Sequence, residues 1–214
     1  MIDPRPAILK GLRQLRVTMS ALVRDRSGVA AIEFAFVVPI LLCMYFMTME
    51  ISQAVETNKK LGRAGNLVGD LVTQQAEITS SEIDGILQIG EALLQPYKHG
   101  PTITVTAINI GPDPETKKPT GTVLWSRRME TDEENRKTFK AASPSDATVP
   151  SFLNVSGTFV IRVDAALNYK PVLLGDAQGD ALGIGSAFDG IAMGETYYMR
   201  PRRSTTIECK DCPK

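Results

Sequence analysis

The sequence predicts an α+β fold: a long N-terminal helix, a shorter second helix and an antiparallel sheet of about four strands. Three observations lead to this prediction. An apolar run near the N-terminus passes into a helical apolar pattern, a capped amphipathic segment follows, and beyond about residue 100 the apolar residues recur at every second position. About 165 residues follow the apolar run, which is enough for one modest domain.

The first predicted element is a helix from Val29 to about Gln75. Its residues 29–49 form an apolar run of about 31 Å, which matches the hydrocarbon thickness of a membrane. Pro39 lies within this run, and membrane helices tolerate a proline, usually with a bend. The alternative is a secretory signal removed after Ala54, but it would have about 54 residues where about 15 to 30 are usual. The length therefore favours a transmembrane segment.

Charge is distributed unevenly along the chain. Residues 1–28 hold six basic and two acidic residues, a net charge of +4, whereas the remainder has a net charge of −4. Positive flanks of a membrane segment stay in the cytoplasm. We therefore expect a cytoplasmic leader over 1–28 and a periplasmic α+β domain over 76–214, on the two sides of an inner membrane. The basic residues orient the chain and contact membrane lipid, so they give no support for nucleic-acid binding.

The helical pattern continues beyond the membrane run as an apolar stripe. Its members are Ile51, Ala54, Val55, Leu61, Ala64, Gly65, Val68 and Val72. Gly62, Gly65 and Gly69 fall on one side of this stripe. Each glycine in an exposed helix costs about 1 kcal/mol relative to alanine, which is understandable where a sheet or the helix of a neighbouring subunit comes close. The alternative is that the three glycines only lower the stability of the helix.

A second, shorter helix is predicted to begin at Thr79 and to end before Pro96. Thr79 and Glu82 have the spacing of a capping box, in which each side chain accepts a hydrogen bond from the backbone N–H of the other residue. Alternation of apolar and polar residues then predicts strands over 102–110, 122–128, 159–169 and about 192–200. The alternation slips by one position near Ala107, which indicates a β-bulge. A short helix is predicted near 133–142.

One carboxylate, that of Glu33, lies in the first turns of the apolar run. A glutamate at that depth costs about 2.5 to 3.5 kcal/mol on insertion scales, and such a residue usually has a partner. A cut between Gly28 and Val29 would create an α-amino group that could be this partner. The alternative is that the side chain of Glu33 reaches the membrane boundary of an uncut anchor.

The segment Gly28 to Phe34, Gly-Val-Ala-Ala-Ile-Glu-Phe, resembles the processing site of type IV pilins and pseudopilins. The similarity is closer to TadE/TadG-like proteins of the tight-adherence (Tad, or Flp) pilus system. Similar segments follow at 49–54, 123–127 and 198–204. The resemblance implies cleavage after Gly28 by a prepilin peptidase, with Glu33 and Phe34 as the membrane carboxylate and the recognition residue.

The departures from that family point to a minor subunit. The leader of 28 residues is long for a pilin, Phe34 stands where major Flp pilins carry tyrosine, and the region after the membrane helix is far larger than in those pilins. The resemblance therefore implies a minor pseudopilin that packs laterally against other pilins and minor pseudopilins during pilus biogenesis. Two alternatives remain: an uncleaved single-pass membrane protein with a periplasmic binding module, and a secreted domain released after Ala54.

Residues suited to catalysis or cofactor binding are scarce. His99 is the single histidine, no phosphate-binding loop occurs, and Gly175, Gly179, Gly183 and Gly185 lack the strand–turn–helix context of a dinucleotide site. We therefore expect no enzymatic activity, no cofactor, no metal and no small-molecule substrate.

The three cysteines fall into two groups. Cys43 lies in the apolar run and is expected to behave as a small hydrophobic residue. Cys209 and Cys212 form Cys-Lys-Asp-Cys, which can close a small disulfide loop in an oxidising compartment. The alternative is that the two cysteines stay unpaired in a C-terminal tail. A zinc site is not expected here, because it would need two further ligands.

Overall fold

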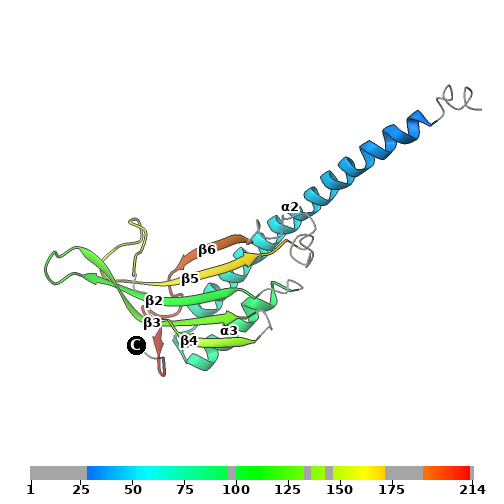
Figure 1. Ribbon diagram of the computed structural model, residues 1–214. Coiled ribbons are helices and arrows are strands. Elements are labelled where there is room, and N and C mark those ends of the chain that lie inside the picture. Colours follow the sequence, from blue (N-terminus) through cyan, green and yellow to red (C-terminus); the bar gives the residue numbers. More distant parts are fainter. Residues whose placement is uncertain (1–27, 96–99, 133–135, 143–146, 172–189, 213–214) are drawn as a thin grey trace, which may run out of the picture. The chain divides into compact units, whose positions relative to one another are not determined.

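A computed structural model describes most of the chain after the leader (Figure 1). The described residues are 28–95, 100–132, 136–142, 147–171 and 190–212. The chain divides into two units, residues 1–49 and residues 50–214. We call residues 50–214 the sheet domain. The basic leader over 1–27, His99 and the glycines between 175 and 185 lie outside the described residues.

Helix α2 (Val29–Thr73) contains Pro39 and ends two residues before the predicted Gln75. Among the described residues it is the one helix long and apolar enough to cross a membrane, and its apolar window has no buried residues. A single long apolar helix of this kind fits a single-pass membrane protein. The predicted long first helix is confirmed.

The second helix is α3 (Ser80–Ala92), and it begins as the sequence predicted. The hydroxyl of Thr79 accepts a hydrogen bond from the backbone N–H of Glu82, and a carboxylate oxygen of Glu82 accepts one from the N–H of Thr79 at 2.8 Å. The capping box is therefore confirmed. Two short strands, β1 (Glu77–Ile78) and β7 (Glu208–Cys209), pair in parallel beside this helix start.

The main sheet has five strands in the order β4-β3-β2-β5-β6, and all neighbours are antiparallel. The strands are β2 (Thr102–Pro112), β3 (Pro119–Thr131), β4 (Lys137–Ala141), β5 (Thr158–Tyr169) and β6 (Ile191–Met199). The predicted α+β class and the four predicted strands are confirmed. The register between β2 and β3 shifts between Ala107 and Ile108, so the predicted bulge is confirmed as well.

The helix predicted near 133–142 is wrong for its described residues, because Lys137–Ala141 form strand β4. These residues pair with Arg127–Thr131 of β3. The side chain of Phe139 also packs against the core cluster beneath the sheet. Pairing to a neighbouring strand thus overrides the local helical preference of a polar segment.

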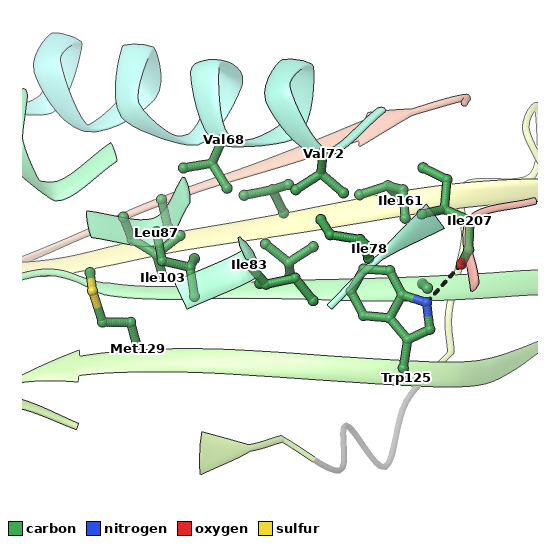
Figure 2. Packing of buried hydrophobic residues seen from close by; sticks show 14 of the residues in the cluster. Val68, Val72, Ile78, Ile83, Leu87, Ile103, Trp125, Met129, Ile161 and Ile207 are labelled. Carbon is green, nitrogen blue, oxygen red and sulfur yellow. Dashed lines mark hydrogen bonds between the residues drawn. The ribbon is translucent and has the colours of Figure 1, made fainter. Parts of the chain in front are cut away.

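The core lies between the two helices and one face of the sheet. Figure 2 shows Val68 and Val72 of α2 and Ile83 and Leu87 of α3 facing strand residues such as Ile103. All five side chains are fully buried. Burying a side chain of this size stabilises the fold by about 1.5 to 3 kcal/mol, so this helix-to-sheet layer holds the domain together.

Substitution of Gly90 tests this packing. A Cβ there would lie 2.4 Å from Cγ2 of the buried Val68. We expect Gly90→Ala to lower the free energy of unfolding by about 1 to 3 kcal/mol through overpacking. Urea unfolding of the full chain in detergent, followed by the fluorescence of the single tryptophan, measures this change in stability.

Gly85→Ala is the matched control, because a Cβ at that position of the same helix meets nothing within 4 Å. It should raise stability by up to about 1 kcal/mol, and equal effects of the two changes would contradict the packing.

Candidate functional site

The predicted processing junction lies where α2 begins. Gly28 is the residue immediately before the helix, and its carbonyl oxygen accepts a hydrogen bond from the N–H of Ile32 at 3.1 Å. Gly28 is exposed, and a Cβ at this position would meet nothing within 4 Å. The bond between Gly28 and Val29 therefore joins the helix to the leader, at a position with open space around it.

Glu33 and Phe34 lie on the first turns of α2, and both are exposed in the isolated chain. Glu33 follows Val29 by four residues, so the two positions share one face of the helix. An α-amino group on Val29 would thus lie one helical turn from the Glu33 carboxylate. Phe34 is on a neighbouring part of the helix surface.

The apolar stripe that follows the membrane run divides into two parts. Leu61, Ala64 and Val68 are fully buried against the sheet domain. Ile51 and Val55, in contrast, are 63% and 49% exposed. The sequence predicted one continuous stripe, but only its later part packs on the sheet.

The three glycines of α2 lie where the sheet comes closest. A Cβ at Gly62 would lie 2.8 Å from the Tyr197 hydroxyl, and one at Gly69 would lie 2.7 Å from the sulfur of Met199. A Cβ at Gly65 would lie 3.1 Å from the ring of Tyr197. Close approach of a sheet, one of the two predicted reasons for these glycines, is therefore confirmed.

Polar contacts fix the same stretch of α2 along its length. The Tyr169 hydroxyl at the end of β5 donates a hydrogen bond to Oε1 of Glu50 at 2.9 Å. At the other end of α2, Arg202 forms an ion pair with Asp70, and its backbone N–H donates to the carbonyl of Thr73 at 3.0 Å. The helix from Glu50 onward is thus held to the sheet domain at both ends.

A C-terminal clasp, which we define as residues 204–212, closes the space between α3 and the sheet. The indole N–H of Trp125 donates to the carbonyl of the fully buried Ile207 at 2.8 Å (Figure 2). Cys209 and Cys212 are joined by a disulfide bond. Their sulfurs and the Asp211 carboxylate lie within 4.8 Å of one another, but sulfurs in a disulfide are not thiolate ligands for a metal ion.

The clasp also caps α3 from outside the helix. Asp211 accepts hydrogen bonds from the backbone N–H of Ser80 at 2.7 Å and from its hydroxyl at 2.6 Å. These hydrogen bonds lower the pKa of the Asp211 carboxyl below its ordinary value of 3.8. A negative charge at the first turn of a helix is also favoured by the helix dipole. Lys210 pairs with Glu77 of β1, which raises the pKa of the lysine.

Sequence reasoning missed the residues that join these elements. Arg127 of β3 binds Asp84 of α3 through two hydrogen bonds of 2.8 and 2.7 Å, and this carboxylate raises the pKa of the guanidinium group. The alternation of apolar residues along β3 could have indicated this pair, because Arg127 lies on the same inward side of the strand as Trp125 and Met129. A charge on an inward strand position requires an opposite charge on the covering helix.

Comparison with known proteins bears on the helix alone. Residues 28–64 match the model of a family described as TadE-like protein. This segment of α2 is TadE-like. The match begins at Gly28 and includes Glu33 and Phe34, so the resemblance noted in the sequence is confirmed over this segment. No curated protein and no solved structure matches the chain.

The TadE-like match indicates a role in pilus assembly, which involves interaction with other pilus components. TadE-like proteins are structural or assembly components and are not a known enzyme family. The segments 123–127 and 198–204 lie outside the match, but their residues have structural roles here. Trp125 binds the clasp, and Arg127 binds Asp84 of α3. Met199 and Arg202 contact α2.

Removal of the Asp211 charge tests the cap on α3. Because its pKa is lowered on folding, Asp211 contributes stability above pH 3.8, and this contribution is lost as the pH falls through the lowered pKa. We expect Asp211→Asn to lower Tm by a few degrees at neutral pH. The difference from the wild-type chain should shrink as the pH falls below 3.8.

Thermal unfolding of the full chain in detergent across this pH range measures the effect. The control is the same change in a Ser80→Ala background, where the hydroxyl contact is already lost, so the effect should be smaller. A Tm difference that does not vary with pH would contradict the assignment.

Proposed function

We propose that this protein is a minor pilin-like subunit, a pseudopilin, in the biogenesis of a Tad/Flp-type pilus. The observation that carries this proposal is the TadE-like match over 28–64, which includes Gly28 and Glu33. Gly28 immediately precedes the long helix α2, and Glu33 lies in its first turns. Its partners are a prepilin peptidase, other pilins and minor pseudopilins, and the lipid of the inner membrane. Its work is associative, and no substrate is turned over.

The proposed processing step is hydrolysis of the bond between Gly28 and Val29. Gly28 is exposed and immediately precedes α2, so a peptidase at the membrane surface can reach this bond without opening the sheet domain. The products are a leader that ends in a carboxylate and a helix that begins with a charged amine. This amine pairs with Glu33 of the same chain or of a neighbour, which lowers the cost of both charges in lipid.

The remaining parts of the chain follow from this role. The leader over 1–28 stays in the cytoplasm until it is removed, residues 29–49 span the inner membrane, and the sheet domain lies in the periplasm. The domain is much larger than that of a major pilin, which favours a minor subunit at the base or tip of a pilus. There the helix packs laterally against other pilin-like helices.

The two alternative functions differ at the N-terminus. An uncleaved single-pass membrane protein would retain Met1. A secreted domain released after Ala54 would require a cut within α2, which is a continuous helix at that position. Such a cut would also remove Glu50 and its hydrogen bond with Tyr169. This contact favours an anchor that stays attached to the sheet domain.

The mass of the mature N-terminus tests the cleavage. In cells that contain the prepilin peptidase, we expect Val29 as the first residue. We expect Gly28→Ala to block processing and piliation, because the peptidase requires the conformational freedom of glycine at the cut. The added Cβ meets nothing within 4 Å, so the change leaves the folded chain intact. Gly85→Ala is the control and should be processed normally. Retention of Met1 in the wild-type chain, or normal maturation of Gly28→Ala, would overturn the proposal.

Substitution of Glu33 tests the role of the carboxylate. Glu33→Gln keeps the shape and removes the charge, so the amine of Val29 loses its counter-ion. A hydrogen bond to a charged group contributes about 1.5 to 3 kcal/mol, so we expect subunit association and surface fibres to fall about tenfold or more. Co-purification of pilus subunits and counting of fibres measure this. Val37→Ala, one turn further along the helix, is the control. Unchanged association and fibre number in Glu33→Gln would exclude an ion pair between the Val29 amine of one chain and Glu33 of a neighbouring chain.

A further inference from the structure

The disulfide of the clasp closes a loop of four residues that presents one side chain to the start of α3. The loop runs from Cys209 to Cys212, and Asp211 lies within it. The Asp211 carboxylate accepts hydrogen bonds from the backbone N–H and the hydroxyl of Ser80 at 2.7 and 2.6 Å. The first N–H groups of a helix have no partner within the helix itself. The disulfide therefore limits how far this outside partner can move from the helix start.

The strand that precedes Asp211 holds the loop through few contacts. β7 has two residues, and they pair with the two residues of β1. One further backbone hydrogen bond joins the N–H of Lys210 to the carbonyl of Ile78 at 3.2 Å. The half-buried Cys209 and Cys212 pack against the core cluster. The positions of Asp211 and Cys212 therefore depend on the disulfide and on the contacts that Asp211 itself makes.

Reduction of this bond would return freedom to the end of the clasp. Lys210 and Asp211 are exposed, so water can solvate both side chains when they leave their partners. Each backbone residue that is released regains conformational entropy. The hydrogen bonds between Asp211 and Ser80 would then compete with water without covalent support. The carboxylate would leave the helix start, while the core between the helices and the sheet would stay packed.

The charges around the sulfurs favour a stable disulfide over a reactive thiolate. In redox catalysts with a Cys-x-x-Cys motif, a helix N-terminus or a nearby positive charge stabilises the thiolate. Here the helix N-terminus faces the Asp211 carboxylate, and Lys210 pairs with Glu77. The Cys209 sulfur lies 3.7 Å from an oxygen of this carboxylate, whose negative charge opposes a thiolate. The pair is thus suited to being oxidised and held, and is poorly suited to exchanging disulfides repeatedly.

We propose that the Cys209–Cys212 pair is a redox-controlled latch: its oxidation fixes Asp211 over the start of α3, and its reduction releases Asp211. The oxidant is an oxidised thiol–disulfide exchange protein. A thiolate of the pair attacks the disulfide of this protein, and the second thiol then displaces the protein from the mixed disulfide. Two electrons and two protons pass from the pair to the partner, whose disulfide becomes a dithiol. The supply of this oxidant rests on the proposed location of the sheet domain in the periplasm.

Hydrogen exchange of the full chain in detergent tests the release of the helix start. All samples carry Cys43→Ala, which leaves Cys209 and Cys212 as the two cysteines of the sequence. After reduction, we expect the amides of residues 77–82 to exchange about tenfold faster or more. Residues 103–107 of β2 are the internal control and should exchange at an unchanged rate. No change at 77–82, or equal acceleration at 103–107, would overturn the latch.

The coupling between the disulfide and the cap is tested separately. If the disulfide favours the contact of Asp211 with Ser80, the contact must favour the disulfide by the same factor. We therefore expect Asp211→Asn to shift the equilibrium with dithiothreitol about three- to tenfold toward the reduced pair. Trapping of thiols with a maleimide, followed by mass spectrometry, measures this shift. Glu208→Gln is the control, because it removes an exposed carboxylate from β7 and leaves Asp211 in place. Equal shifts in the two variants, or no shift in Asp211→Asn, would overturn the coupling.

Thiol trapping in intact cells tests the oxidant and separates this proposal from the proposed function. We expect an oxidised pair in wild-type cells and free thiols in cells that lack the exchange protein. Free thiols in wild-type cells would overturn the latch, and full oxidation without the exchange protein would overturn the choice of partner. The N-terminal mass is read on the same samples. A chain that begins at Val29 but has free thiols refutes the latch alone, whereas an oxidised chain that retains Met1 refutes the processing alone.

Discussion

Close contact between α2 and the sheet is the constraint on which the rest of the sheet domain depends. Side chains of β5 and β6 occupy the space beside Gly62, Gly65 and Gly69, so these positions need residues without a side chain. The approach lets α2 bury its later apolar residues on the strands, and α3 then fills the remaining part of the same face. If α2 stood further from the sheet, the inward residues of β5 would meet water.

One helix thus has two different environments. Apart from Glu33 and Thr48, residues 29–49 are apolar on all sides, whereas the later turns have one buried face. Within the TadE-like segment only Thr57, Leu61 and Ala64 are buried by this chain. Packing within the sheet domain therefore accounts for a small share of that segment. We propose that lipid and neighbouring subunits surround the remainder.

Local patterns were sufficient to predict the helices, the strands, the capping box and the bulge, because each depends on residues close together in the sequence. Pairing that joins distant residues was not predictable in this way. β4 forms because Phe139 and its neighbours find β3, and Glu50 meets Tyr169 across 119 positions. The predicted processing residues are contiguous, so they could be proposed from the sequence alone, and cleavage after Gly28 stays a prediction.

The clasp gives the order of synthesis a structural meaning. Ser80 begins α3, but the carboxylate that caps it follows 131 residues later, and the strand that pairs with β1 comes from the same late segment. A nascent chain therefore holds an incomplete helix start until nearly the whole domain has emerged from the ribosome. An interrupted chain that ends before the clasp therefore has neither the Asp211 contacts at Ser80 nor a strand to pair with β1.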